Sequence, residues 1–227
     1  MKVKLTGGLV AFVAATCYGG PIVIGAPTTQ GNCFPFGCAT GTRYQQVYDA
    51  SSFPAAINIG TIIFYADAYR GDDNLLSNGV FELYLSTTSR AVNTIDNFPF
   101  DTNLGSDNTL FATVTGPFVI PDVWQITGGP FYYNPAAGNL LLDVRVTYPA
   151  GRQDGHLYLN ARNGDAGGLF SRAHNFGTAF DDWGLVTGFD GPQAPPGPPG
   201  IPEPGTLGLL GLGACFLAGL RWRARAS

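Results

Sequence analysis

Carboxylates are the side chains of this 227-residue chain that suit acid–base chemistry. Hydrolysis of a glycan needs two of them, one as general acid and one as base or nucleophile. Glu82 lies on the polar face of an alternating segment, opposite Phe81 and Leu83. Half of the aspartates adjoin Gly or Asn, where we expect them to bond to turn backbone. The sequence has no Gly-x-Ser-x-Gly elbow and no histidine in a triad pattern. We therefore expect no enzymatic activity, with a secreted glycan hydrolase as an alternative.

A second group of oxygen-bearing side chains occurs in one predicted loop. Asp101, Asn103 and Asp107 are the candidate calcium ligands. Calcium binds six to eight oxygens, more than this loop supplies alone, and the EF-hand pattern is absent from the sequence. The alternative is ordinary turn chemistry, in which such side chains hydrogen-bond to neighbouring backbone. Calcium is the one cofactor that the sequence suggests.

Two cysteines lie close together in the middle of the chain. Cys33 and Cys38 enclose Phe-Pro-Phe-Gly, and the proline and glycine can turn the chain back on itself. The other two, Cys17 and Cys215, fall in or beside the terminal apolar runs. Zinc would require further soft ligands, and the two histidines are not spaced as zinc ligands. In an oxidising compartment we expect a disulfide between Cys33 and Cys38.

Aromatic side chains are the remaining candidates for ligand binding, because their rings stack on the apolar faces of sugars. Aromatic residues make up 13% of the chain, so most must fill the core. We expect Trp183 to be buried and Tyr133 and Tyr158 to be the surface positions for sugar stacking. A carbohydrate-binding module for exopolysaccharide is therefore an alternative function.

The N-terminal segment has the pattern of a secretory signal peptide. Met1-Lys2-Val3-Lys4 is basic, and the apolar run from Leu5 to Ala15 has the length of a signal peptide rather than of a membrane span. We place the signal peptide within residues 1–26, with cleavage after Ala15 or near Ala26. Pro27 directly after Ala26 disfavours the second position. A lipidation site at Cys17 is disfavoured by Thr16.

Residues 27–190 show short alternating segments instead of a helical period. The predicted strands cover residues 57–69, 80–86, 109–115, 118–126, 140–148, 156–160 and 183–189. Gly, Asn, Asp and Pro separate them, which is the pattern of an antiparallel β-sandwich. We predict a mostly β, jelly-roll-like sandwich of one domain, with helix confined to the two ends of the chain.

The predicted domain is acidic. Between residues 27 and 200 the chain has seven arginines, no lysine and fifteen carboxylates, a net charge of −8 against −4 for the whole chain. A domain without a basic stripe is unsuited to nucleic acid or to anionic membrane surfaces. We therefore expect no nucleic-acid partner.

The C-terminal part has a linker and a compound tail. Residues 191–201 are rich in Pro and Gly, as in a polyproline-II spacer. Pro202-Glu203-Pro204 follows, then an uncharged run over residues 206–220, then Arg221, Arg223 and Arg225. A helix over that run spans roughly 22 Å, so it needs its flanking residues to cross a hydrocarbon core of about 30 Å. We predict a single transmembrane helix with the arginines on the cytoplasmic side.

The order of these three parts, over residues 202–227, resembles the PEP-CTERM sorting signal of exported proteins of Gram-negative bacteria. The resemblance implies recognition by an exosortase, cleavage near Pro202-Glu203-Pro204 and only transient anchoring in the inner membrane. It also implies release to the cell surface or to an exopolysaccharide matrix. Residues 130–144 and 183–189 resemble the β-sandwich domain common among such proteins, which transfers no catalytic residues. We expect a non-catalytic structural or adhesive role at the cell surface or in the extracellular matrix.

Overall fold

The computed structural model describes residues 20–26, 30–39, 41–67, 73–162, 168–175 and 180–193. Within these ranges the chain forms short strands and short 3-10 helices, so the predicted mostly β fold is confirmed. The strands are β1 (Ile22–Ile24), β2 (Gly31–Asn32), β3 (Arg43–Tyr48), β4 (Ile57–Tyr65), β5 (Val80–Thr88), β6 (Thr109–Thr115), β7 (Val123–Tyr133), β8 (Asn139–Thr147), β9 (Leu159–Arg162), β10 (Phe170–His174), β11 (Gly184–Leu185) and β12 (Thr187–Asp190). The 3-10 helices are η1 (Ala50–Ser52), η2 (Phe100–Asn103) and η3 (Pro135–Ala137).

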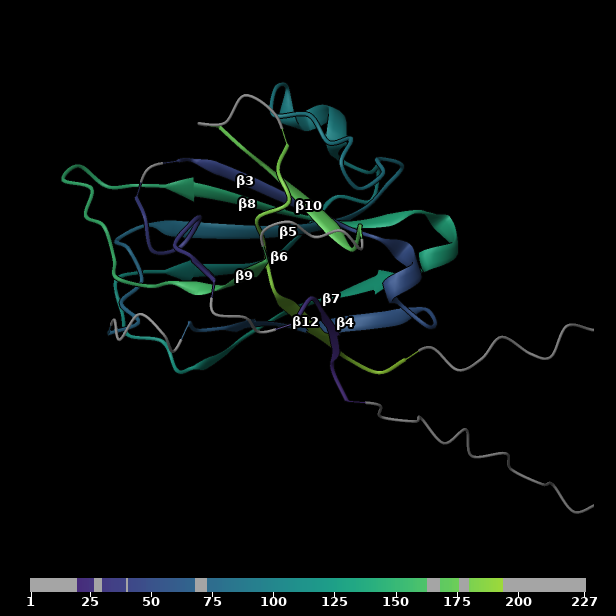
Figure 1. Ribbon diagram of the computed structural model, residues 1–227, viewed down its shortest axis with the longest axis horizontal. Coiled ribbons are helices and arrows are strands. Elements are labelled where there is room, and N and C mark those ends of the chain that lie inside the picture. The colour runs from purple at the N-terminus through teal and green to yellow at the C-terminus, as the bar shows by residue number, and fades with distance from the viewer. Residues whose placement is uncertain are drawn as a thin grey trace, which may run out of the picture. The chain divides into compact units, whose positions relative to one another are not determined.

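The strands form three antiparallel sheets. One sheet has four strands in the order β1-β12-β4-β7, and a second has five in the order β10-β3-β8-β5-β6. A third, smaller sheet has the order β11-β9-β2. Figure 1 shows β4, β7 and β12 in one layer and β3, β8 and β5 in the other. The two larger sheets therefore form the two layers of the domain.

The hydrophobic core joins these two layers. The ring of Phe36 lies between the layers and contacts three aromatic rings at centroid distances of 5.1–5.3 Å. Two of these rings, Phe64 and Trp124, belong to the four-stranded sheet, and the third, Phe81, belongs to the five-stranded sheet. Farther along, the ring of Tyr48 in β3 meets that of Phe189 in β12 at 5.0 Å. Tyr48 and Phe189 come from opposite layers, and Phe36 contacts both layers. The apolar faces of the two sheets are therefore buried against each other.

Strand β8 has the predicted alternation on its inner face, but its outer face is covered too. Leu140, Leu142, Val144 and Val146 belong to the main core. Leu141, on the opposite face of the strand, is also fully buried, because Ile95 before η2 and Phe100 in η2 pack over this face of the sheet. The residues of this second, smaller core are Val47, Ile95, Phe100, Leu141 and Ala173. The five-stranded sheet is thus covered on both faces along part of its length.

Strand β4 departs from the predicted pattern. In a regular strand, Ile59 would lie on the same face as Ile63 and Tyr65. The register against β7 instead shifts between Ile59 and Thr61, so Ile59 joins the main core together with Ile62. At this irregularity β7 has two residues more than β4, and the buried face of β4 changes between Ile59 and Ile62.

The folded region extends beyond both predicted limits of the domain. Strand β1 lies before residue 27, and Gln193, after residue 190, forms an isolated bridge with Ile57. In the described ranges no helix has the length and apolar character needed to cross a membrane. The apolar runs over residues 5–15 and 206–220 lie outside the described residues.

Candidate functional site

The predicted disulfide between Cys33 and Cys38 is present, with the two Cα atoms 5.2 Å apart. Between them the backbone N–H of Gly37 donates to the carbonyl of Cys33, which closes a tight turn. A Cβ at Gly37 would overlap the backbone carbonyl of Leu157, so only glycine allows this close approach. The disulfide therefore holds a loop that is packed directly against the chain before β9.

This disulfide loop is part of the core. Phe34 is 3% exposed and Phe36 fully buried. Phe34 packs edge-on against Tyr44 of β3 and His174 of β10, while Phe36 fills the space between the layers. The loop thus inserts two aromatic rings between elements that are distant in sequence.

Replacing both Cys33 and Cys38 by Ser should lower the free energy of unfolding by about 2 kcal/mol, because the closed loop is short and removes little entropy from the unfolded chain. The sequence separation of the two cysteines is 5. Urea unfolding of the wild-type and double-variant proteins measures the change. Reductant should lower the stability of the wild type to that of the variant and leave the variant unchanged. Equal stability of the oxidised wild type and the variant would contradict the prediction.

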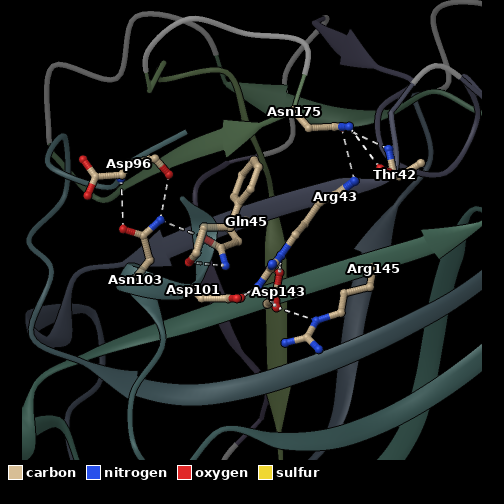
Figure 2. A network of polar contacts seen from close by, with 10 residues as sticks. Thr42, Arg43, Gln45, Asp96, Asp101, Asn103, Asp143, Arg145 and Asn175 are labelled. Carbon is tan, nitrogen blue, oxygen red and sulfur yellow. Dashed lines mark hydrogen bonds and ion pairs between the residues drawn. The ribbon is translucent and has the colours of Figure 1, made fainter. Parts of the chain in front are cut away.

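A buried carboxylate connects two arginines on the outer face of the five-stranded sheet (Figure 2). The Asp143 side chain in β8 is 1% exposed and accepts hydrogen bonds from Arg43 Nε and Nη2, both at 2.9 Å, and from Arg145 Nε at 3.0 Å. Arg43 also pairs with Asp101, whose side chain is 76% exposed, at 2.8 Å. Burial alone would lower the pKa of Arg43, but the hydrogen bonds and charges of Asp143 and Asp101 raise it. The guanidinium therefore stays charged, and Asp143 is fully engaged as an acceptor.

The candidate calcium ligands are each engaged in separate hydrogen bonds. Asp101 pairs with Arg43, and Asp107 Oδ1 accepts from the backbone N–H of Thr87 at 2.8 Å. Asn103 is fully buried; its amide donates to Gln45 Oε1 and to the Asp96 carbonyl, both at 2.7 Å. Across the ranges that the structure describes, no group of three or more His, Cys, Asp or Glu side chains is arranged to hold a metal. Asp101, Asn103 and Asp107 therefore each contact a different residue that is distant in sequence.

The predicted surface aromatics are placed differently from our expectation. Tyr133 is fully buried and its hydroxyl donates to the carbonyl of Gly138 at 2.8 Å, so its ring is not available for sugar stacking. Tyr158 is half-buried. Conversely, Trp183, predicted to be buried, is 38% exposed, and Tyr132 on β7 is 56% exposed. The prediction for Tyr133 was wrong because β7 continues to this residue with Tyr133 on its inner face.

A second charged cluster lies where β10 meets the segment before β11. Asp181 accepts from Arg172 Nε at 2.5 Å and from Arg172 Nη2 at 3.1 Å, and His174 Nε2 lies 3.3 Å from its Oδ2. Burial alone would raise the pKa of Asp181. The hydrogen bonds of His174 and Arg172, the Arg172 charge and the backbone N–H of Trp183 outweigh burial and hold this pKa well below its usual range.

We expect this cluster to make stability pH-dependent. A carboxyl whose pKa is lowered by folding stabilises the protein above its unfolded pKa of about 3.9, and this contribution is lost as the pH falls below that value. Asp181→Asn should therefore show a smaller loss of unfolding free energy than the wild type between about pH 5 and pH 2. Asp182→Asn is the matched control, because Asp182 is the neighbouring aspartate and is not among the residues that hold Asp181. Parallel pH profiles for wild type and Asp181→Asn would contradict the assignment.

Both ends of the folded region leave from the same end of the four-stranded sheet. Ile22, which opens β1, pairs with Phe189 near the end of β12. After β12 the chain continues to Gln193, which bridges Ile57 at the start of β4, and the Asn58 N–H donates to the Pro192 carbonyl at 3.0 Å. The segments before residue 20 and after residue 193 therefore join the domain close to one another.

Comparison with known proteins identifies the C-terminal segment. Residues 200–226 match the family model described as the PEP-CTERM protein-sorting motif. No curated protein and no solved structure matches the chain. The matched range includes the predicted sorting residues Pro202, Glu203, Pro204, Arg221, Arg223 and Arg225, which lie outside the described residues. The chain therefore carries a PEP-CTERM sorting signal, which indicates export and processing by an exosortase.

Proposed function

We propose that this chain is a cell-surface or extracellular-matrix protein that an exosortase cleaves near Pro202-Glu203-Pro204, and that its β domain has a non-catalytic structural or adhesive role. The observation that carries the proposal is the sorting motif over residues 200–226. Before cleavage the tail holds the protein in the inner membrane; after cleavage the domain and its linker are released.

The disulfide and the net charge of the domain support a location outside the cytoplasm. A disulfide such as that between Cys33 and Cys38 persists in an oxidising compartment. Net charge of −8 over residues 27–200 favours solubility over adsorption to anionic membranes.

The polar side chains support a structural role. Asp143 and Asp181 are both held by arginine, and an acid–base carboxylate would need to be free to exchange a proton with a substrate. The buried glutamines Gln45 and Gln46 also have hydrogen-bond partners within the fold. These networks fix the sheet and its covering loops in place.

Replacing Pro202, Glu203 and Pro204 by Ala in the native host should retain the protein in the membrane fraction and remove most of the released form, because the processing enzyme loses its recognition sequence. Immunoblots of membrane and secreted fractions measure the distribution. Replacing Pro198 and Pro199 by Ala is the matched control, since these linker prolines precede the motif. Release of the triple variant at the control level would contradict the proposal.

A further inference from the structure

Strand β1 is an integral part of the folded domain although it lies within the region predicted as signal peptide. Its three residues pair with β12 in the register Ile22 with Phe189, Val23 with Gly188 and Ile24 with Thr187. Ile24 is 2% exposed and belongs to the main core, and Ile22 packs against that core. The domain thus uses residues on the N-terminal side of Ala26.

The turn that follows β1 is also fitted to the domain. Gly25 has a φ of +89°, in the left-handed region that favours glycine. A Cβ at this position would approach the Phe170 ring to 3.1 Å and Val186 to 3.2 Å. The chain therefore passes close to β10 and the β11–β12 connection before it reaches the exposed Ala26. Val23, on the opposite face of the strand from Ile24, is 41% exposed, as expected for a strand with one buried face.

Loss of β1 would expose the edge of the four-stranded sheet. Strand β12 lies between β1 and β4, so removing β1 leaves one side of β12 without a hydrogen-bonding partner. The same cut uncovers apolar surface that Ile22 and Ile24 bury. An unpaired apolar edge is a template for aggregation, which an exported protein must avoid.

We propose that signal peptidase cleaves this chain on the N-terminal side of β1, at the Ala15–Thr16 bond, and that the mature protein retains Ile22–Ile24. Val13 and Ala15 supply the small residues that such a site requires. Cleavage after Ala26 would remove β1 and would place Pro27 directly after the cut. The reaction is a hydrolysis: water adds across one peptide bond, leaving a carboxylate on Ala15 and an amino group on Thr16. This inference rests on the proposed function, because cleavage here requires export.

The test is intact mass and N-terminal sequencing of the full-length protein expressed in its native host. We expect the processed chain to begin at Thr16, and any start from Thr16 to Pro21 retains β1. A start at Pro27, or at any residue beyond Ile22, would overturn the inference and leave the proposed export intact. A chain that keeps Met1 in every fraction would instead contradict the proposed function, and the inference with it.

A matched pair of variants separates the two cleavage positions. Ala15→Leu places a large side chain where the enzyme requires a small one, so the full-length precursor should accumulate at least about tenfold over wild type. Ala26→Leu makes the same chemical change at an exposed position and should leave the precursor level unchanged. The opposite pattern, with Ala26→Leu blocked and Ala15→Leu processed, would overturn the inference.

Discussion

Phe36→Ala should lower the free energy of unfolding by about 3–5 kcal/mol, the range for truncating a buried phenylalanine to alanine. The Phe36 ring is fully buried and contacts Phe64, Phe81 and Trp124 at centroid distances of 5.3, 5.3 and 5.1 Å. These neighbours come from both layers, and the disulfide fixes the loop that carries Phe36. The surroundings therefore have little freedom to collapse into the space that the ring leaves. Urea unfolding followed by tryptophan fluorescence measures the change, since Trp124 lines that space.

Phe98→Ala is the control for this measurement. Phe98 lies in the loop before η2 and is 88% exposed. Its truncation removes the same number of atoms without opening a cavity, so stability should change by less than about 0.5 kcal/mol. Equal effects of the two substitutions would show that Phe36 does not join the layers as described.

Asp143→Asn should destabilise the fold by about 3 kcal/mol, near the lower end of the range for breaking a buried ion pair. The substitution keeps the size of the side chain but leaves the charges of Arg43 and Arg145 without their shared carboxylate. The effect lies at the lower end because the arginine side chains are 19% and 35% exposed and can regain some hydration. Chemical unfolding at neutral pH measures it.

Asp101→Asn is the matched control, because Asp101 pairs with the same arginine but has a side chain that is 76% exposed. An exposed ion pair contributes less than about 1 kcal/mol. The two substitutions thus make the same chemical change at buried and exposed ends of one network (Figure 2). A larger loss for Asp101→Asn than for Asp143→Asn would contradict the assignment of Asp143 as the centre of that network.

Much of the fold was predictable because several strands alternate clearly. Strand β6 has the predicted bounds, and β5 places Phe81, Leu83 and Leu85 in the core as expected. The change of buried face in β4 was not predictable, because the residues on both sides of it are apolar. A shift of one residue there exchanges one isoleucine for another and leaves no trace in the hydrophobic pattern.

Two strands of the five-stranded sheet were missed because they bury polar side chains. Strand β3 carries Gln45 and Gln46, both fully buried, and β10 carries Arg172 and His174, both at least 94% buried. Gln46 is accommodated because its amide donates to the Leu185 carbonyl at 2.8 Å and its Oε1 accepts from the Leu185 N–H at 2.8 Å. These hydrogen-bond partners are distant in sequence, so the local sequence gives no sign that the polar side chains are buried. The polar residues therefore made the sequences of both strands resemble those of loops.

The candidate sites likewise divide into features that the local sequence predicts and features that depend on distant contacts. The disulfide was predictable because its two cysteines are local in sequence and the intervening residues favour a turn. The burial of Asp143 in an ion-pair network was not predictable. Arg43 lies 100 residues away in sequence, and the pattern of β8 does not indicate that the loop around η2 covers this face. Sequence therefore predicted the local chemistry well, and tertiary packing decided which side chains are buried.

The most direct test of exosortase processing is the intact mass of the protein in the membrane and secreted fractions of a host with and without its exosortase. With the enzyme, we expect a secreted species that lacks everything after the Pro202-Glu203-Pro204 region, including Arg221, Arg223 and Arg225. Without the enzyme, the full C-terminus should remain in the membrane fraction. A single membrane-bound form that keeps residues 205–227 in both hosts would show that the tail is a permanent anchor and would contradict cleavage by an exosortase.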